Sequence, residues 1–363
     1  MQLPGKTLKL PAFFPDGTYG GVKAAGAEDL LTAGVDGVVM NAYHLYRKPG
    51  IGCVKKHGGI HSFSGWGGPV LTDSGGFQVY SLIRENPNHG QVLKDKIIFR
   101  PEPGGEKVIF TPEKCMQIQF ALKADMMVCL DYCTAPQDGP EEQEKSVETT
   151  LRWAASCKKE YEKLVKSCKY DSRPLLFAVI QGGASKELRR VCAEALSAIG
   201  FDGYGYGGWP VDENGVLMTD ILEYTAGLMP EGSVKYAMGM GRPEEVAALA
   251  AMGYNLFDCV IPTREARRHR LYVFAQNPKD LSRSDLMDKS FYRHVYIMDE
   301  KYAADKAALS EFCPCPLCRR HSRAYLRHLF KTGDPLAQRY ATIHNLTFYS
   351  TLMKALRGEL HDE

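Results

Sequence analysis

The sequence predicts an α/β protein, namely a (β/α)8 TIM barrel followed by a small C-terminal subdomain. Eight short apolar segments alternate with longer segments of helical periodicity, which is typical of βα units and a parallel sheet. The apolar segments are nearly continuous, as are strands that a parallel sheet buries on both faces. A chain of 363 residues has room for a barrel of about 250 residues and an appendage of about 80–110. A doubly wound sheet is the alternative fold.

Each element follows from this alternation. The predicted strands are residues 12–14, 37–40, 69–72, 126–130, 175–180, 203–208, 235–240 and 256–261. The predicted helices are residues 24–33, 112–124, 141–167, 186–199, 217–229 and 243–252. After the last strand we expect a turn over 264–270, an extra strand over 271–274 and a final helix over 345–357. The expected domains are a catalytic barrel (1–270), a subdomain (271–344) and a C-terminal helix that packs back on the barrel (345–363).

Composition and charge exclude several classes of protein. The chain is 44% hydrophobic and 24% charged, which excludes collagen-like, coiled-coil and disordered proteins. No apolar run approaches the ~20 residues of a membrane helix, and the N-terminus does not read as a secretory signal. The 11 cysteines are an odd number and are mostly scattered singly in apolar segments, unlike a disulfide framework. We therefore expect a cytoplasmic protein that does not associate with membranes.

The basic residues are concentrated in two places although the net charge is only +2. Residues 264–270 contain four arginines, and residues 312–333 contain five basic residues and no acidic one. Local basic surface of this kind suits the phosphate backbone of a nucleic acid. A solvated helix face and a turn explain the charge pattern equally well.

Polar residues follow the predicted strands at the end where barrel enzymes carry their active sites. These residues are Asn41, Asp73, Asp131, Gln181 and Asp258. A single Asp after a strand is usually a helix cap or a turn residue, but three at the same end favour a pocket. Two carboxylates facing one bond suit glycosidic substitution, one as nucleophile and one as acid/base. The third carboxylate suits a planar purine, whose ring Phe77 and Met238 could sandwich.

A cysteine cluster near the C-terminus predicts a metal site. Cys313, Cys315 and Cys318 are closely spaced, and His344 follows 26 residues after the last of them. Three thiolates and one imidazole close a tetrahedral zinc site without an open position, which is the structural kind. His321 and His328 are nearer in sequence, but His328 lies on a predicted helix that continues away from the cysteines. We therefore expect one structural zinc ion per chain.

The sequence resembles the tRNA-guanine transglycosylase family, of the bacterial type, over essentially its whole length. The matching segments include TDSGGFQ from Thr72, LDYCT from Leu130, FAVIQGG from Phe177, GYGYGGWPVDE from Gly203, LFDCVIPTREAR from Leu256 and CPCPLC from Cys313. The resemblance implies a barrel with a zinc subdomain, usually a homodimer. It also implies a glycosyltransferase that exchanges the wobble guanine of certain tRNAs for a 7-deazaguanine, without cutting the RNA backbone.

Matching positions imply a role for each site residue. Asp258 resembles the nucleophile that attacks the ribose, and Asp73 resembles the acid/base that exchanges a proton with the departing and incoming bases. The expected base pocket contains Asp131, Gln181, Gly208, Phe77, Met238, Ser74, Cys133, Asn41 and Trp209. The expected tRNA contacts are Arg264, Arg267 and Arg242. The expected zinc ligands are Cys313, Cys315, Cys318 and His344.

The chain departs from the family pattern beside Gly208. Where bacterial members commonly have Gly-Leu-Ala-Val-Gly-Glu, residues 208–213 read Gly-Trp-Pro-Val-Asp-Glu. Family enzymes can turn either face of the peptide after the Leu position toward the 7-substituent of the base. Pro210 has no N–H, so only the Trp209 carbonyl can face that substituent, which favours an amine donor. We therefore expect 7-aminomethyl-7-deazaguanine as the incoming base, with queuine as the competitor because Trp209 reshapes the pocket.

Three other functions are weighed against this one. A non-catalytic tRNA-binding paralogue would lose the nucleophile, whereas this chain keeps Asp258 and Asp73. The same chemistry on DNA or on a free nucleoside is compatible with the sequence. A barrel glycoside hydrolase would hydrolyse its substrate without base exchange, and it would leave the cysteine cluster and the arginines without a role.

Overall fold

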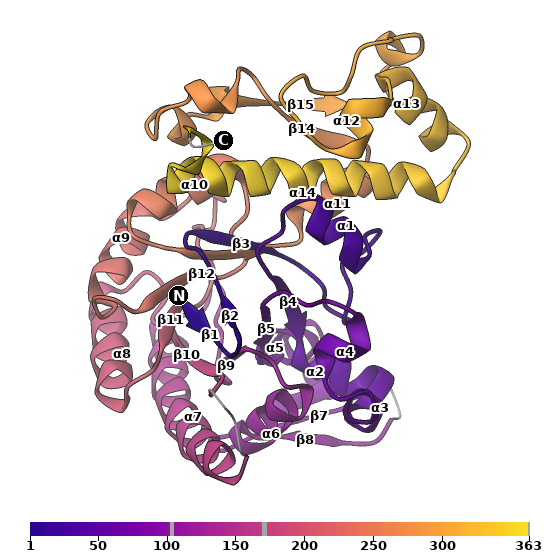
Figure 1. Ribbon diagram of the computed structural model, residues 1–363. Coiled ribbons are helices and arrows are strands. Elements are labelled where there is room, and N and C mark those ends of the chain that lie inside the picture. Colours follow the sequence, from indigo (N-terminus) through magenta and orange to yellow (C-terminus); the bar gives the residue numbers. More distant parts are fainter. Residues whose placement is uncertain (102–104, 169–172, 362–363) are drawn as a thin grey trace.

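The computed structural model, which describes residues 1–101, 105–168 and 173–361, confirms the predicted barrel (Figure 1). Eight strands form one sheet in the order β3-β13-β12-β11-β10-β9-β5-β4. Every pairing in this order is parallel. A parallel bridge between Asp16 and Val39 joins β3 to β4, and the Gly17 N–H donates to the Val39 carbonyl at 2.7 Å. The two edges of the sheet therefore meet, and the barrel closes.

All eight predicted strands are present. They are β3 (Ala12–Pro15), β4 (Val38–Asn41), β5 (Val70–Asp73), β9 (Met126–Val128), β10 (Leu175–Ile180), β11 (Gly203–Tyr206), β12 (Val234–Ala237) and β13 (Leu256–Cys259). The predictions for β9, β11, β12 and β13 run two or more residues too far. The apolar pattern continues past these strands because the residues that follow them line the mouth of the barrel.

The six predicted helices are also present, and all except α8 have at least one shifted end. They are α1 (Ala27–Thr32), α6 (Pro112–Leu122), α7 (Pro140–Ser167), α8 (Lys186–Ile199), α9 (Thr219–Leu228) and α10 (Pro243–Ala251). The turn expected over 264–270 is wrong, because α11 (Ile261–Arg267) is a helix. Proline in its first turn suits a helix start, where the missing N–H would be unsatisfied anyway.

Several elements were not predicted. The helices among them are α2 (Ala42–Leu45), α3 (Ile51–Lys56), α4 (Ile60–Ser64) and α5 (Gly76–Glu85), with a π-helical segment at Tyr46–Gly50. The strands are the hairpin β1 (Gln2–Leu3) and β2 (Lys6–Thr7), and the antiparallel sheet β6 (Gly90–Val92), β7 (Ile97–Phe99) and β8 (Val108–Phe110). Short 3₁₀ helices lie at Pro87–His89, Pro278–Asp280, Asp285–Met287, Lys289–Phe291, Glu300–Tyr302 and Glu359–His361. Except for α5, these segments were not predicted because they are too short to show the hydrophobic periodicity of a helix or a strand.

The direction of the side chains in the barrel decides which residues can form a site. Successive side chains of a strand point to opposite faces of the sheet. The buried interior cluster includes Phe14, Val39, Leu71, Val179, Tyr236 and Leu256. Two residues further along each strand, the inward positions belong to Asp16, Asn41, Asp73, Gln181, Met238 and Asp258. Polar residues therefore gather inside the mouth, at the carboxyl ends of the strands.

Strand β11 contributes only glycine to the barrel interior. Its two tyrosines pack outward against the helices, so its glycines face inward. A Cβ on Gly205 would lie 2.7 Å from Met238 Sδ, and a Cβ on Gly207 would lie 2.5 Å from Gln181 Nε2. The absence of side chains on β11 therefore provides the space that Met238 and Gln181 occupy.

The C-terminal subdomain stands on one long helix. The hairpin of β14 (Arg270–Phe274) and β15 (Tyr292–Tyr296) and the helices α12 (Pro316–Arg320) and α13 (Arg323–Lys331) lie on the far side of α14 (Pro335–Arg357) from the barrel (Figure 1). Helix α14 also packs against α1, α11 and β3 of the barrel. The sequence predicted that this helix begins at residue 345, but it begins ten residues earlier, at Pro335. The Asp334 side chain caps the helix by accepting a hydrogen bond from the Leu336 N–H. The predicted boundary after residue 344 lies within α14, and the division into domains stays a prediction.

No helix in the described ranges is both long enough and apolar enough to span a bilayer.

Candidate active site

Asp258 is held at the end of β13 by two hydrogen bonds to one of its oxygens. The buried hydroxyl of Tyr236 donates to Oδ1 at 2.7 Å, and the Gly239 N–H donates to the same atom at 2.7 Å. No hydrogen bond from the described residues to Oδ2 is present, so this oxygen is available to a substrate. Burial raises the pKa of Asp258 to about 6, and the negative charge of Asp73 adds to the effect.

Asp73 lies at the end of β5 beside Asn41, its register partner on β4. The Asn41 Nδ2 donates to Asp73 Oδ2 at 3.1 Å. The Asn41 Oδ1 accepts from the His44 N–H at 3.0 Å as the cap of α2, which fixes the amide. Burial raises the pKa of Asp73, against the hydrogen bonds it accepts from the N–H groups of Ser74 and Gly75. Asn41 therefore orients Asp73 and, like the other donors, opposes the effect of burial, which is the cause of the raised pKa.

Asp131 and Gln181 form the third polar pair. Gln181 is fully buried, and its Nε2 donates to Asp131 Oδ2 at 2.7 Å. Burial raises the pKa of Asp131 to about 7, and the charge of Asp73 contributes. Gln181 Oε1 is buried without a partner, and a Cβ on Gly208 would lie 3.5 Å from it. A buried acceptor without a partner next to a residue without a side chain indicates a place for a ligand.

Two of the predicted pocket residues lie in the backbone turns that shape this pocket. Ser74 is buried, and its Oγ accepts from the Gly76 N–H at 3.1 Å, so its hydroxyl is used in the turn before α5. Cys133 is also buried and accepts a hydrogen bond from the Gly208 N–H, while burial raises the pKa of its thiol to about 12. Cys133 is therefore a neutral wall of the pocket and no nucleophile.

The rim of the mouth carries two exposed aromatic side chains. Phe77 is 43% exposed and Trp209 is 46% exposed. Their ring centroids are 6.4 Å apart in an edge-on arrangement, although Phe77 comes from the first turn of α5 and Trp209 from the loop after β11. Met238 is half-buried inside the mouth, against Gly205. The structure therefore brings the two predicted walls, Phe77 and Met238, and the predicted pocket residue Trp209 to one end of the barrel.

The predicted tRNA-contacting arginines follow β12 and β13 at this same end. Arg242 is the N-cap residue of α10 and pairs with Glu245 at 3.3 Å, and its side chain is largely exposed. Arg264 on α11 is exposed. Arg267 on α11 is half-buried, and its Nη1 is buried without a partner. Their roles stay predictions.

Sequence reasoning missed two residues next to the site. Arg189 on α8 is fully buried, and it donates from Nη1 to the Ile180 carbonyl at 2.6 Å and from Nε to the Gly183 carbonyl at 2.9 Å. It thereby fixes the turn that carries Gln181. Asp16, at the end of β3, faces the mouth by strand alternation, which is the signal that could have found it.

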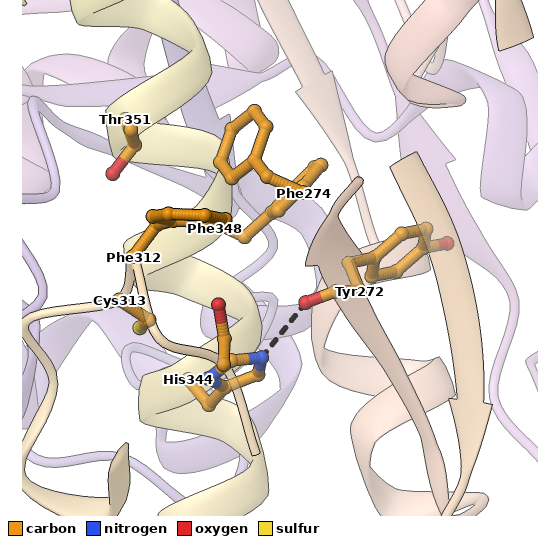
Figure 2. Close-up of a pocket in the computed structure, with 8 residues that line it drawn as sticks. Tyr272, Phe274, Phe312, Cys313, His344, Phe348 and Thr351 are labelled. Atoms are coloured by element: carbon orange, nitrogen blue, oxygen red, sulfur yellow. Dashed lines mark hydrogen bonds between the residues drawn. The ribbon is translucent and has the colours of Figure 1, made fainter. Parts of the chain in front are cut away.

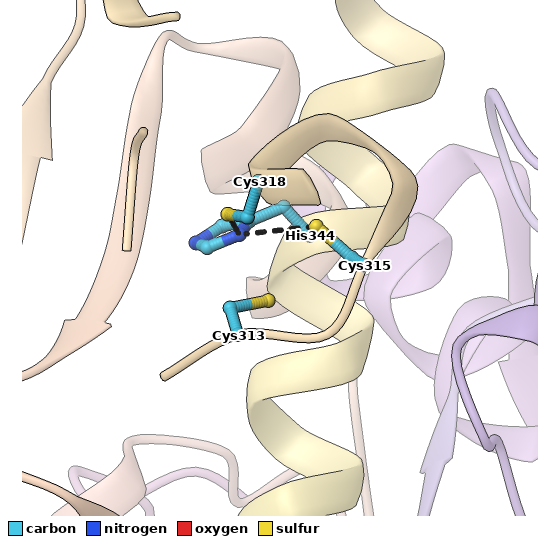
Figure 3. Close-up of side chains that lie close together, drawn as sticks. All are labelled: Cys313, Cys315, Cys318 and His344. Carbon is cyan, nitrogen blue, oxygen red and sulfur yellow. Dashed lines mark hydrogen bonds between the residues drawn. The ribbon is translucent and has the colours of Figure 1, made fainter. Parts of the chain in front are cut away.

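The predicted metal ligands come together in the subdomain (Figure 3). The ligand atoms of Cys313, Cys315, Cys318 and His344 lie within 4.8 Å of one another. The sulfurs of Cys318 and Cys315 are 3.3 and 3.6 Å from His344 Nδ1. Tetrahedral coordination by zinc would separate sulfur and nitrogen by about 3.5 Å, so the spacing fits such an ion. His321 instead contacts the Tyr340 hydroxyl at 3.1 Å.

The second ring nitrogen of His344 fixes the tautomer that metal binding needs. Its Nε2 lies 2.7 Å from the Tyr272 carbonyl (Figure 2). A carbonyl can only accept, so Nε2 carries the hydrogen and Nδ1 presents its lone pair to the thiols. Aromatic side chains, including Phe274 and Phe348, surround a small cavity beside the cluster. The cluster could bind a metal ion, and its closed surroundings suit a structural role.

The fold and the carboxylates define a barrel enzyme equipped for substitution at a sugar carbon. The whole chain, residues 1–363, matches the family model described as Queuine tRNA-ribosyltransferase. Relatives of that name include proteins of Actinobacillus succinogenes (38% identical over 357 residues, 98% of this chain and 87% of the relative) and Aliivibrio salmonicida (36% over 363 residues, 100% and 90%). Another is that of Shouchella clausii (38% over 363 residues, 100% and 88%). The chain therefore belongs to the queuine tRNA-ribosyltransferase family, which confirms the resemblance.

Proposed function

We propose that this protein exchanges the wobble guanine of tRNA for a 7-deazaguanine through a covalent bond between the ribose and Asp258. The observation that carries the proposal is the pair of inward-facing carboxylates, Asp73 and Asp258, at the carboxyl ends of β5 and β13. They are close enough for the charge of Asp73 to raise the pKa of Asp258. Membership of a family of pentosyltransferases supports the same reaction.

The first displacement breaks the bond between the sugar and guanine. Asp258 Oδ2 attacks the anomeric carbon while Tyr236 and Gly239 hold Oδ1. The electron pair of the broken bond stays with guanine, and the Asp73 carboxyl transfers its proton to the departing base. The products are free guanine, a ribosyl ester of Asp258 and an ionised Asp73. The raised pKa of Asp73 favours the protonated form that this step needs.

The second displacement reverses these roles. The incoming 7-deazaguanine loses its ring proton to Asp73, and its nitrogen attacks the anomeric carbon. The ester bond breaks, and its electron pair returns to Asp258 as a carboxylate. Two inversions give retained configuration, which is why a covalent intermediate is needed. The flipped base must leave its stack, which is less costly in an anticodon loop than in a duplex.

The pocket that contains Asp131, Gln181 and Gly208 recognises the base. Asp131 accepts hydrogen bonds from the ring N–H and the amino group of the purine, and Gln181 Nε2 is the neighbouring donor for its carbonyl. Gly208 leaves room at the edge of the base, as the unpartnered Gln181 Oε1 beside it indicates. Phe77 and Met238 cover the two ring faces.

The favoured incoming base is 7-aminomethyl-7-deazaguanine. Pro210 cannot present an N–H, so the Trp209 carbonyl is the group that can accept from an amine on the 7-substituent. The contact between Trp209 and Phe77 narrows the rim where a larger substituent, such as that of queuine, would extend. Competition between the two bases for one tRNA transcript tests this preference. Preferential incorporation of queuine would reverse it.

We infer that the Cys313, Cys315, Cys318 and His344 cluster holds zinc, which supplies folding energy and no catalysis. The donor set is that of structural zinc sites, and the sulfur-to-nitrogen distances suit its tetrahedral geometry. We further infer a cytoplasmic location, where tRNA is found. A homodimer stays a prediction, to be checked by analytical ultracentrifugation.

Incorporation of radiolabelled guanine into tRNA is the test of the proposed function. We expect label to enter wild-type reactions with RNA and to be lost with Asp258→Asn. Release of free base without incorporation would indicate a hydrolase. Binding of tRNA without either reaction would indicate a non-catalytic paralogue. Exchange into DNA but not RNA would place the chemistry on another substrate.

A further inference from the structure

Asp16 faces the mouth of the barrel from β3, and no step of the proposed reaction uses it. It directly follows Pro15, the last residue of β3, and continues the inward series of that strand after Phe14. Phe14 is the register partner of Asp258 on β13, and Asp16 itself pairs with Val39 on β4. Asp16 therefore lies between the strand of the nucleophile and the strand of Asn41.

One oxygen of Asp16 is used by the protein and the other is not. The Thr18 hydroxyl and the Thr18 N–H both donate to Oδ1, at 2.5 and 3.2 Å. Within the described ranges, no hydrogen bond or ion pair ends on Oδ2, and the side chain is half-buried. The turn after β3 thus holds the Asp16 carboxylate in place through Oδ1 and leaves Oδ2 as an acceptor for another group.

The strand order places Asp16 on the side of Asp258 that lies away from the strands of the base pocket. The base pocket lies on β9, β10 and the end of β11, whereas Asp258 is on β13 and Asp16 is on β3, the next strand along. A nucleotide whose base occupies the pocket and whose anomeric carbon meets Asp258 therefore directs the rest of its ribose toward β3. The charge of Asp16 raises the pKa of Asp258, which indicates that the two carboxylates are near neighbours.

A basic side chain with an unsatisfied donor completes this side of the mouth. Arg267 on α11 has a buried Nη1 without a partner. Burial lowers the pKa of Arg267, and the nearby charge of Asp16 opposes that effect. No direct ion pair joins the two in the described part of the chain, which leaves a carboxylate and a guanidinium facing the same region without satisfying each other.

The chemistry of an internal nucleotide narrows what Asp16 can accept. In a continuous RNA strand the 3′ and 5′ oxygens are esterified, so the 2′-hydroxyl is the one remaining sugar donor. A carboxylate is an acceptor only. Resting on the proposed function, we propose that Asp16 Oδ2 accepts a hydrogen bond from the 2′-hydroxyl of the target nucleotide and makes the enzyme selective for RNA over DNA. Arg267 then meets the adjacent phosphate.

The test compares two substrates in two proteins. The substrates are an RNA hairpin with guanosine at the target position and the same hairpin with 2′-deoxyguanosine there. The measured quantity is kcat/KM for guanine exchange, in wild type and in Asp16→Ala. A hydrogen bond to a charged group gives a preference of about 10- to 100-fold for the ribose substrate in wild type. We expect Asp16→Ala to bring that preference below about threefold by slowing the ribose substrate alone.

The controls separate the possible failures. Asp220→Asn changes an exposed carboxylate on α9 and should leave the preference unchanged. If Asp16→Ala does not fold, Asp16→Asn takes its place, because its amide oxygen can still accept the hydrogen bonds from Thr18. Asp16→Asn lacks the charged acceptor, so its preference for the ribose substrate should also fall. An unchanged preference in folded Asp16 variants would overturn the role of Asp16 while exchange continues. No exchange by wild type on either hairpin would instead overturn the proposed function.

Discussion

The mouth of the barrel and the cysteine cluster are both groups of ionisable side chains, but they are assembled in opposite ways. The cluster takes three of its four ligands from residues 313–318, and their atoms face one point that a single ion can fill. The mouth takes its carboxylates from β3, β5, β13 and the turn after β9, which are far apart in sequence. The negative charge of Asp73 raises the pKa of both Asp131 and Asp258.

This difference separates a stabilising site from a reactive one. A metal ion would neutralise the thiolates and join α12 and the loop before it to α14, so the cluster converts binding into folding energy. The mouth keeps partly buried carboxylates that the fold would hold more stably if they were neutral. In the proposed reaction, that instability gives Asp73 a proton to donate and Asp258 a reactive oxygen.

Removing the nucleophile should have the largest effect. Asp258→Asn keeps the shape of the side chain and the contacts of Oδ1, but it replaces the attacking carboxylate by a weak nucleophile. We expect guanine exchange to fall by at least about 10³-fold, measured with labelled guanine and tRNA. Asp73→Asn should also impair turnover. Asp220→Asn is the matched control, and a similar loss there would point to a non-specific cause.

Breaking the cysteine cluster should mainly reduce stability. Cys315→Ser, or removal of metal by a strong chelator, is expected to lower the free energy of unfolding by about 3–5 kcal/mol, measured by denaturant titration. Cys168→Ala changes an exposed cysteine outside the cluster and should have no such effect. Full stability after complete metal removal would contradict a structural role, as would metal analysis that finds none.

Neutralising Asp131, the carboxylate proposed to bind the base, should weaken base binding while it stabilises the fold. Asp131→Asn removes a carboxylate whose pKa burial raises to about 7. We expect the protein to gain about 1–2 kcal/mol of stability, less than the full shift implies because Asp131 is not fully buried. The KM for the incoming base should rise about 10- to 100-fold. Loss of both stability and base affinity would mean that Asp131 is a structural residue.

Between pH 4 and pH 7, activity and the stability of the mouth should change in opposite directions. The pKa values of Asp258 and Asp131, about 6 and about 7, exceed that of an unfolded Asp at about 3.9. Their protonated forms therefore favour the folded state, and this stabilisation is lost as pH rises through the folded pKa values. The ionised forms are the reactive ones, so kcat/KM should fall about tenfold per pH unit or more below pH 6. Asp131→Asn should flatten the stability profile.

The barrel and the cluster could be predicted from the sequence because each has a strong local signal. Eight apolar segments mark the strands, and the spacing of Cys313, Cys315 and Cys318 marks the metal site. Asp73, Asp131 and Asp258 were predictable because each lies at or shortly after the carboxyl end of an apolar segment. Helix α5 was missed because it follows Gly75, which has a positive φ of 81°, and a glycine pair usually indicates a loop.

Other parts of the site depend on contacts that no local pattern encodes. Pro15, Asp16 and Gly17 read as a turn, so strand alternation could find Asp16 only if the predicted strand 12–14 were extended through it, as the register with β4 and β13 shows. Arg189 reads as an exposed residue of an amphipathic helix, yet it is buried against the carbonyls at the end of β10. The edge-on contact of Phe77 and Trp209 joins the start of α5 to the loop after β11, and the whole barrel sets the distance between them.

Trapping the ribosyl intermediate tests the central proposal most directly. Wild-type protein is incubated with an RNA hairpin, denatured and digested, and the modified peptide is located by mass spectrometry. We predict that RNA lacking the target base is attached to Asp258, and that Asp258→Asn yields no adduct. An adduct on another residue, or normal exchange by Asp258→Asn, would contradict the account.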